Sequence, residues 1–335
     1  MNVAMWGKAL QVIPRLSKED WNGLDIVARW LIATRSAVLI MTFISVAFAG
    51  LLAYRDSGFN LGLWLLATVG LLMAHATNNL LNDLTDFYRG VDKDNYFRAQ
   101  YGPQPLVHGL MGMREALIYA AVTGLIALMI GAYLVYVRGN IAFWLLVLGA
   151  FFVLFYTYPL KYIGLGEVAV FIVWGPLMVG GTYFIVTGGW SWNVVVASLP
   201  YALGVTAVLF GKHIDKIDAD QAKHILTLPV LLGERYARYA VIALTTLQYV
   251  LTIVLISRGF FSPVLLIVFL ALTALVLLVG VYRHPRPEVP PDNYPRGLWP
   301  LWFVTFAFLH NRRFGLLFLL GLVLDVILRS VGWVR

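Results

Sequence analysis

Amide and carboxylate side chains gather where the second long apolar run of this sequence ends, in Thr77–Asp94 (TNNLLNDLTDFYRGVDKD). On a helix they share one broad face, because they recur at spacings of three, four, seven and eight residues: Asn78, Asn79, Asn82, Asp83 and Asp86. Asp92 extends this group into a charged loop. Carboxylate and amide oxygens are the ligands that hard divalent cations such as Mg²⁺ prefer.

A second acidic group follows another apolar run, at Asp215, Asp218 and Asp220. If the two groups face each other across a helix bundle, they could grip a diphosphate through bridging metal ions, which neutralise the charge of a leaving diphosphate. The alternative is that these acids form solvated helix ends. That interpretation is weaker for the asparagines, because polar side chains inside a membrane span are costly and usually face a cavity or a partner.

The composition excludes a soluble domain. The chain has 335 residues, of which 60% are hydrophobic and 13% charged, and its mean hydropathy is +0.79. Long apolar runs rather than short alternating ones predict an all-α polytopic membrane protein. Cysteine is absent, which excludes disulfides and thiolate chemistry. The mixed first 26 residues predict no cleavable signal peptide.

We expect nine transmembrane helices in one membrane domain over residues 1–335, because each apolar run reaches or nearly reaches the length that a bilayer requires. The predicted spans are Arg35–Tyr54, Leu61–Phe87, Glu115–Val137, Ile141–Tyr158, Gly164–Thr187, Val194–Lys212, Ala237–Ser257, Pro263–Tyr282 and Phe314–Leu328. Residues 1–34 form an amphipathic N-terminal segment that is expected along the membrane interface. Residues 283–313 form a proline-rich loop, in which Leu301–His310 is expected to be a short interfacial or re-entrant piece.

The basic residues predict the orientation. With the N-terminus in the cytoplasm, 20 of the 25 Lys and Arg residues fall on that side. Both acidic groups then lie on the cytoplasmic face, so we expect an integral protein of the cell (inner) membrane with its site facing the cytoplasm.

The motifs resemble those of a known family. NDLTDFYRGVD, Asn82 to Asp92, resembles the first aspartate motif of the UbiA superfamily of intramembrane prenyltransferases, in its MenA-like form. DKIDADQAKHILTLPVLLG, Asp215 to Gly233, resembles the second motif, with its Thr-Leu-Pro-x-x-Leu-Gly tail. Further similar pieces are YPLKYIGLGEV at 158–168, LVHGL at 106–110 and the Gly175, Pro176, Gly181, Thr182, Tyr183 pattern. The resemblance covers nearly the whole chain and implies a UbiA-type bundle.

The resemblance implies Mg²⁺-dependent transfer of a polyprenyl group from a polyprenyl diphosphate to an aromatic acceptor. It places two Mg²⁺ ions on Asn82, Asp86 and Asp92 and on Asp215, Asp218 and Asp220. Catalytic roles fall to Asp86, Asp220, Lys161 and Glu167, the last as a group that orients or deprotonates the acceptor or else only favours a helix N-terminus. Substrate contacts are expected from Asn78, Asn79, Asp83, Arg89, Lys93, Arg98, Lys212, Tyr158 and Tyr183, with the tyrosines as candidates to stabilise an allylic cation.

The sequence departs from the family pattern at two places. The second motif commonly has aspartates four residues apart, and the position four before Asp220 is Lys216, so its partner would be Asp215 or Asp218. Where relatives carry a basic pair before the LVHGL-like segment, this chain has Pro103 and Gln104. Arg89, Lys93 or Arg98 would then have to supply those diphosphate contacts.

The MenA-like segments favour a 1,4-dihydroxy-2-naphthoate-like quinone precursor as the acceptor. Within the family, 4-hydroxybenzoate, chlorophyllide, haem, glycerophosphate and phosphoribosyl acceptors remain alternatives. An ion- or proton-coupled transporter is a rival from another class, but it predicts acids near mid-bilayer on broken helices. A CDP-alcohol phosphotransferase is a third, although its Asp-x-x-Asp-Gly-x-x-Ala-Arg signature is absent. We expect the lipid bilayer as a partner, no nucleic acid and no obligate protein partner.

Overall fold

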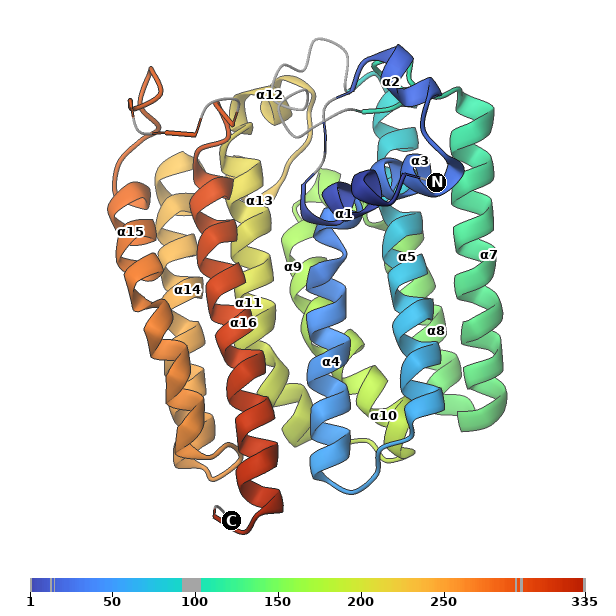
Figure 1. Cartoon of the computed structure of the whole chain (residues 1–335). Coiled ribbons are helices and arrows are strands. Elements are labelled where there is room, and N and C mark those ends of the chain that lie inside the picture. Colours follow the sequence, from blue (N-terminus) through green and yellow to red (C-terminus); the bar gives the residue numbers. More distant parts are fainter. Residues whose placement is uncertain are drawn as a thin grey trace.

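The computed structural model describes residues 2–12, 14, 16–91, 104–292, 294–295 and 298–333. Its secondary structure is helical throughout this part of the chain, and the long helices run side by side in one bundle (Figure 1). The long and medium-length helices are α4 (Ile40–Arg55), α5 (Leu61–Tyr88), α7 (Met113–Arg138), α8 (Asn140–Phe155), α11 (Trp192–Ile214), α14 (Glu234–Ser257), α15 (Leu272–Tyr282) and α16 (Phe303–Ser330). The all-α prediction is confirmed.

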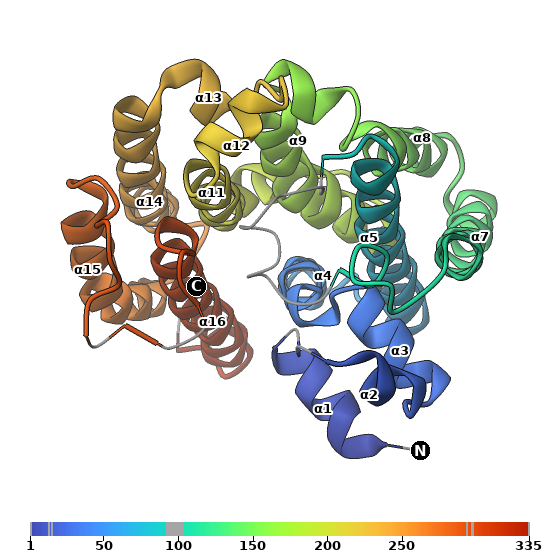
Figure 2. The ribbon, with the colours of Figure 1, turned by 90° about the horizontal axis from the view of Figure 1, so that it is seen from above.

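Within the described residues, seven helices are at least 18 residues long and apolar enough to cross a membrane. They coincide with seven of the nine predicted spans. Of the other two, α8 has only 16 residues, and α16 is 28 residues long but carries Arg312, Arg313, Asp325 and Arg329. The protein is therefore an integral membrane protein, and seven spans are clear among its described residues. Viewed along the bundle, α7 and α15 lie at opposite edges and α4, α9, α11 and α16 nearer the middle (Figure 2).

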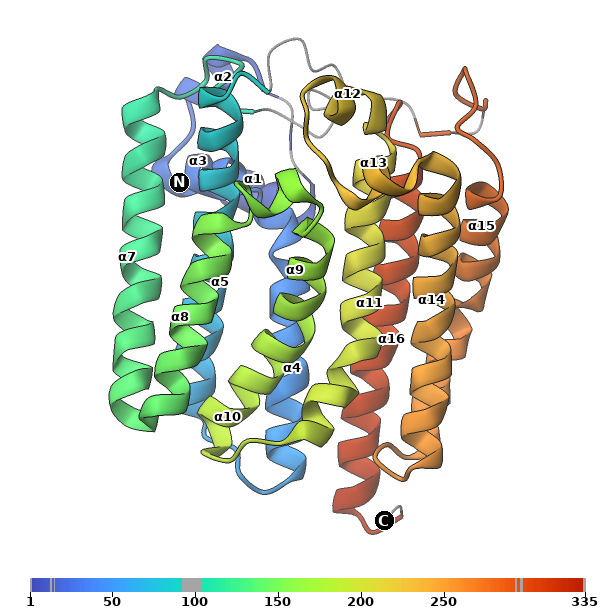
Figure 3. The same ribbon diagram turned by 180° about the vertical axis from the view of Figure 1, so that it is seen from behind.

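One predicted span is a bent helix. It runs from α9 (Gly166–Ile172) through a π-helical stretch (Val173–Gly180) into α10 (Gly181–Thr187), and the bend is plain in Figure 3. Pro176 lies inside the π stretch, and proline lacks the N–H that a regular helix needs. A Cβ on Gly175 would lie 2.7 Å from the Ala202 Cβ, so only glycine lets this bend approach α11 so closely.

The prediction that Leu301–His310 is a separate interfacial or re-entrant piece is wrong. Most of it is the first part of α16, which runs without a break from Phe303 to Ser330. The physical reason is a helix cap that the sequence does not reveal. The Asp215 carboxylate accepts hydrogen bonds from the backbone N–H groups of Trp302, Phe303 and Val304, at 3.1, 2.8 and 2.9 Å. These groups have no partner inside the helix, so the cap fixes where α16 begins.

The N-terminal segment forms three short helices, α1 (Val3–Gln11), α2 (Lys18–Asn22) and α3 (Ile26–Ala33), which lie across one end of the bundle (Figure 1). Trp21 is only 1% exposed and belongs to a core cluster with Leu80 and Leu84 of α5. This tryptophan therefore fixes the segment to α5 instead of facing lipid. We call this end of the bundle, where α5 and α11 finish at Tyr88 and Ile214, the polar end.

Candidate active site at the polar end

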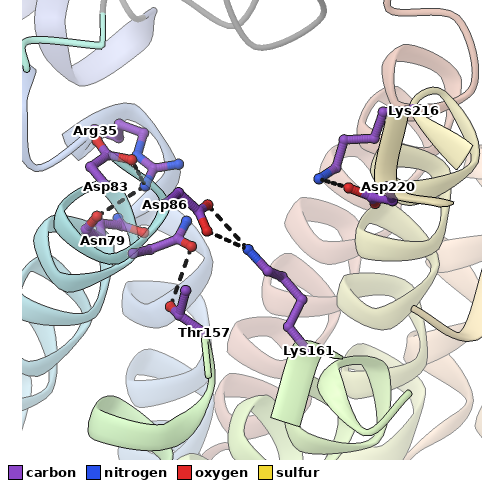
Figure 4. A network of polar contacts seen from close by, with 9 residues as sticks. Arg35, Asn79, Asp83, Asp86, Thr157, Lys161, Lys216 and Asp220 are labelled. Atoms are coloured by element: carbon purple, nitrogen blue, oxygen red, sulfur yellow. Dashed lines mark hydrogen bonds and ion pairs between the residues drawn. The ribbon is translucent and has the colours of Figure 1, made fainter. Parts of the chain in front are cut away.

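The two acidic segments meet at the polar end. The first lies on the last turns of α5, and the second spans the end of α11, α12 (Ile217–Ala222) and the turn that leads to α13 (Leu228–Leu232). The Lys223 ammonium donates to the Gly90 carbonyl at 3.4 Å, which joins the two segments directly. Figure 4 shows Asp86 and Asp220 on opposite sides of one gap, with Lys161 between them. They are on the same end of the bundle, as a shared site requires.

Asp86 forms an ion pair with Lys161. The lysine belongs to a short 3-10 turn, Leu160–Ile163, between α8 and α9, and its ammonium lies 2.9 and 3.1 Å from the two Asp86 oxygens. Both side chains are buried, at 4% and 0% exposure. Asn82 lies one turn earlier on α5 with its amide beside Thr157 at 3.3 Å, and the reversed amide orientation adds a hydrogen bond to Asp86 at 3.2 Å. The predicted pair of Asn82 and Asp86 therefore faces Lys161.

Arg35 organises the other polar residues of α5, and sequence reasoning gave it no role. Its guanidinium binds the Asp83 carboxylate at 2.8 Å and the Asn79 carbonyl at 3.0 Å. Asn79 in turn donates from its side chain to the Thr34 carbonyl at 2.9 Å. Arg35 has a positive φ of 55°, an uncommon conformation for a residue other than glycine. The sequence contains no signal for that backbone conformation. The one available hint was the position of Arg35, a charged residue directly before an apolar run.

Asp220 forms the second buried ion pair. The Lys216 ammonium lies 2.8 Å from one Asp220 oxygen, and the two side chains are 4% and 1% exposed. The other two predicted acids of this segment are placed differently. Asp215 caps α16 as described above, and Asp218 is exposed. Burial raises the pKa of the Asp215 carboxyl to about 7, and the three N–H donors act in the opposite direction. The structure brings only Asp220 into the gap.

Glu167 lies in the first turn of α9, 1% exposed. Its carboxylate lies 2.5 Å from His213 Nδ1 of α11 and accepts a hydrogen bond at 3.3 Å from the Leu228 N–H at the start of α13. Neither Glu167 nor His213 lines the cavity described below. This pair therefore joins α9, α11 and α13 beneath the gap, and the structure does not bring Glu167 to an open acceptor site.

The remaining predicted residues divide into three sets. Asn78 and Lys212 line the cavity, and Asn78 also donates to the Val153 carbonyl at 3.0 Å. Arg89 stacks on the rings of Tyr158 and Tyr162, at 4.1 and 4.7 Å, next to the gap. The phenol of Tyr183 instead donates to Asp56 at 2.8 Å near the opposite end, so its predicted role in the site is wrong. Asp92, Lys93 and Arg98 lie outside the described residues.

Tyr162 is close to both acidic segments. The Asp86 and Asp220 carboxylates both act on its phenol, and burial together with these charges raises the pKa of Tyr162 above the usual tyrosine range. Tyr162 is therefore neutral at physiological pH. Arg89, at the end of the first segment, stacks on the Tyr162 ring at 4.7 Å, and the Leu226 N–H of the second segment donates to the Tyr162 carbonyl at 3.3 Å. Both segments therefore contact this residue.

A cavity of about 660 Å³ opens beside these ion pairs. Its charged lining is at the polar end and consists of Arg35, Asp83 and Lys212, with the amides of Asn78 and Asn82 beside them. Its α5 wall continues to Ala67, 16 residues before Asp83, which corresponds to ~24 Å along a helix. The rest of the lining is largely apolar, with small residues at Gly70, Gly124, Gly131, Gly149 and Gly181. This shape fits a molecule with a polar head and a long apolar tail.

A family model for the UbiA prenyltransferase family matches residues 43–302, well over half of the chain and the whole region that holds both motifs. The chain belongs to the UbiA prenyltransferase family. It is accordingly a prenyltransferase, and the transporter and CDP-alcohol phosphotransferase interpretations are not needed. The match begins inside α4, so the N-terminal helices lie outside it.

Curated relatives agree with the UbiA assignment. The chain is 28% identical over 254 residues to UbiA prenyltransferase domain-containing protein 1 of Danio rerio, covering 73% of this chain and 74% of the relative. It is also 28% identical over 261 residues to the 1,4-dihydroxy-2-naphthoate octaprenyltransferase of Bacillus subtilis (strain 168), covering 76% and 82%. Both alignments extend over most of each protein.

Solved structures share the fold. A UbiA homologue from Aeropyrum pernix K1 matches with a TM-score of 0.65 and 21% identity, over 86% of this chain and 98% of the homologue. A UbiA homologue from Archaeoglobus fulgidus, solved with GPP and Mg²⁺, matches with a TM-score of 0.55 and 15% identity, over 86% and 99%. These similarities confirm a UbiA-type bundle.

The capping role of Asp215 makes a prediction for stability. We expect Asp215→Ala to lower the free energy of unfolding by about 1–2 kcal/mol, because the first turn of α16 loses its cap. Thermal unfolding of the purified protein in detergent measures this change, with the exposed Asp292→Ala as the matched control. If Asp215 were a metal ligand instead, the variant would also lose any thermal stabilisation that Mg²⁺ and diphosphate confer. We expect it to keep that stabilisation.

Proposed function

We propose that this protein transfers a polyprenyl group from a polyprenyl diphosphate to an aromatic quinone precursor of the 1,4-dihydroxy-2-naphthoate type and releases diphosphate. One observation carries the proposal. A long, largely apolar cavity has its charged lining at the same end of the bundle as two buried carboxylate–lysine pairs. The cavity fits an isoprenoid tail, and the charged groups fit the diphosphate that the tail carries.

Mg²⁺ fits the first acidic segment. Asn82 lines the polar end of the cavity, and Asp86 lies one turn further along α5, within 3.2 Å of the Asn82 amide. An amide and a carboxylate supply the kind of oxygen donors that Mg²⁺ prefers. When bound, the ion neutralises the negative charge that develops on the departing diphosphate. Relatives support the use of this ion, since the Archaeoglobus fulgidus homologue was solved with GPP and Mg²⁺.

The cationic side chains of the chain itself would bind and orient the diphosphate. Lys212 lines the cavity, and Lys161 is bound to Asp86, one turn after the cavity-lining Asn82. Arg35 lines the same end while it holds Asp83. Charge-assisted hydrogen bonds from ammonium and guanidinium groups are strong and place phosphate oxygens well. The apolar walls would exclude water from the carbon that reacts, so that the acceptor is prenylated in place of hydrolysis.

The identity of the acceptor is the most specific part of the proposal. The naphthoate octaprenyltransferase of Bacillus subtilis is a relative whose name specifies an acceptor, and it aligns over most of both chains. This agrees with the MenA-like motifs of the sequence. By the distribution of basic residues, the polar end faces the cytoplasm, and the cell membrane is the proposed location.

An acceptor screen tests this function. Membranes that contain the protein are incubated with Mg²⁺, radiolabelled geranylgeranyl diphosphate and one acceptor at a time: 1,4-dihydroxy-2-naphthoate, 4-hydroxybenzoate, chlorophyllide, haem, a glycerophosphate or a phosphoribosyl compound. We expect a labelled lipid product with the naphthoate. Product formation only with another acceptor would move the protein to a different branch of the family. Release of no diphosphate with any acceptor would contradict the proposal itself.

The cavity makes a prediction about donor length. Gly149 of α8 lines it, and a Cβ there meets no atom within 4 Å, so Gly149→Leu should fill cavity space without a clash. We expect the preference for geranylgeranyl over geranyl diphosphate, as a ratio of kcat/KM values, to fall about tenfold or more, since overpacking an apolar site costs about 1–3 kcal/mol. Gly280→Leu on α15 is the control, because Gly280 is equally open but outside the cavity lining. An unchanged ratio in Gly149→Leu would place the tail elsewhere.

A further inference from the structure

Of the three carboxylates in the second acidic segment, one is buried without serving as a helix cap. Asp215 uses both of its oxygens to cap α16. Asp218 is exposed on α12, away from the buried ion pair. Asp220 remains, 1% exposed, and one of its two oxygens is already bound to an ammonium group. Its other oxygen is buried and has no hydrogen-bond partner in the part of the chain that the structure describes.

That ammonium group belongs to Lys216, one helical turn before Asp220 and 4% exposed. Figure 4 shows that the Lys216 side chain extends along Asp220 and ends on the side that faces Lys161 and Asp86. A buried lysine remains charged only beside a compensating carboxylate, and Asp220 is that carboxylate. The second segment therefore already contains a cation, held by the chain itself at the edge of the gap.

A divalent ion does not fit beside this pair. Mg²⁺ requires a near-octahedral set of oxygen ligands and is usually held by one or two carboxylates together with water molecules and substrate phosphates. Asp220 offers one open oxygen, and its charge is balanced at 2.8 Å by Lys216. Among the described residues no group of three or more His, Asp or Glu side chains is arranged to hold a metal ion. The first segment differs in its oxygen donors and not in having a lysine. Asp86 is also paired, with Lys161 at 2.9 Å, but that lysine comes from another element of the fold, and the Asn82 amide of the segment itself lies beside Asp86.

We propose that Lys216 is a built-in cation that replaces the second metal ion of this site. One divalent ion, bound at the first segment, would then hold one side of the diphosphate, and the Lys216 ammonium, oriented by Asp220, would hold the other. This differs from the two-ion arrangement that the sequence resemblance implies. It rests on the proposed function, since it assumes that a diphosphate binds in this gap.

The direct test is to count metal ions. Purified full-length protein in detergent is mixed with Mn²⁺ and farnesyl S-thiolodiphosphate, an unreactive analogue, and bound Mn²⁺ is measured by equilibrium dialysis and electron paramagnetic resonance. We expect one Mn²⁺ per chain, with a spectrum that lacks coupling between neighbouring ions. Two ions per chain with coupled spectra would overturn this inference and leave the proposed function intact. No analogue-dependent Mn²⁺ binding at all would contradict both.

Variants at position 216 test the role of the lysine. Lys216→Met should weaken binding of the analogue about tenfold or more, because a hydrogen bond to a charged group typically contributes that much to affinity. Lys216→Arg should restore most of that binding, and Lys216→Asp should raise the Mn²⁺ count toward two. Lys8→Met, at an exposed lysine on α1 outside the site, should change neither quantity. If Lys216→Met binds the analogue as wild type does, with a normal thermal unfolding profile, Lys216 is not the second cation.

Discussion

Asp86→Ala is expected to abolish Mg²⁺-dependent release of diphosphate from a polyprenyl diphosphate. The variant removes a carboxylate at the proposed metal position and also separates the Lys161 ammonium from its partner at 2.9 Å. We expect kcat/KM to fall at least about 10³-fold, or about 4 kcal/mol of transition-state stabilisation. Diphosphate release from radiolabelled donor in membranes measures it. Turnover close to that of the wild type would remove Asp86 from the site.

For Asp86→Ala, a loss of activity caused by unfolding has to be distinguished from the loss of a catalytic group. Removing one member of a buried ion pair typically costs about 3–5 kcal/mol, because the other charge remains buried. The double variant Asp86→Asn with Lys161→Met removes both charges of the pair. We expect it to unfold at a temperature closer to that of the wild type than Asp86→Ala does, and to remain inactive. A stable double variant that regained activity would show that the pair is structural.

Asp220→Ala is expected to have the second large effect. Asp220 is the single acid of its segment that the structure places in the gap, and it orients Lys216. We expect release of diphosphate to fall at least about 10²-fold, in line with the loss of one group that stabilises charge in a transition state. The same assay measures it, with thermal unfolding recorded in parallel.

Comparison of the single variants Asp218→Asn and Asp220→Asn tests which of these two acids of the second motif takes part in the reaction. Asp218 is exposed, so we expect its replacement to change kcat/KM by less than about threefold, the range of surface substitutions. From the sequence alone, Asp220 is the catalytic candidate, and its partner is Asp215 or Asp218. A loss of activity in Asp218→Asn as large as in Asp220→Asn would mean that the exposed acid moves into the site when substrate binds.

Much of the architecture could be predicted because a membrane span depends on residues that are neighbours in the sequence. Each needs a run of apolar residues, and the runs at Leu61–Tyr88 and Trp192–Ile214 are helices in the structure. The polar positions on α5 could be assigned to one face, since helical spacing is regular and Asn82 and Asp86 are one turn apart. Their common location with Asp220 at one end of the bundle followed from the charge asymmetry of the loops.

Other features depend on contacts between distant residues, and the sequence predicted them incorrectly or not at all. Asp215 was predicted as a metal ligand, but it caps a helix that begins 88 residues later at Phe303. The same cap explains why Leu301–His310 is not a separate interfacial piece. Tyr183 was expected in the site, and its hydrogen bond to Asp56 holds it near the other end. Arg35 received no role because its partners lie on another helix.

The sequence by itself determined that this is a helical membrane protein with two acidic segments at one end, because hydrophobicity and helical period act over neighbouring residues. Only the tertiary structure decided which carboxylates are exposed, which cap a helix and which are paired with a lysine. The reason is that a carboxylate's availability depends on what lies within about 3 Å of it, the hydrogen-bonding distance. At Asp220 that neighbour is Lys216.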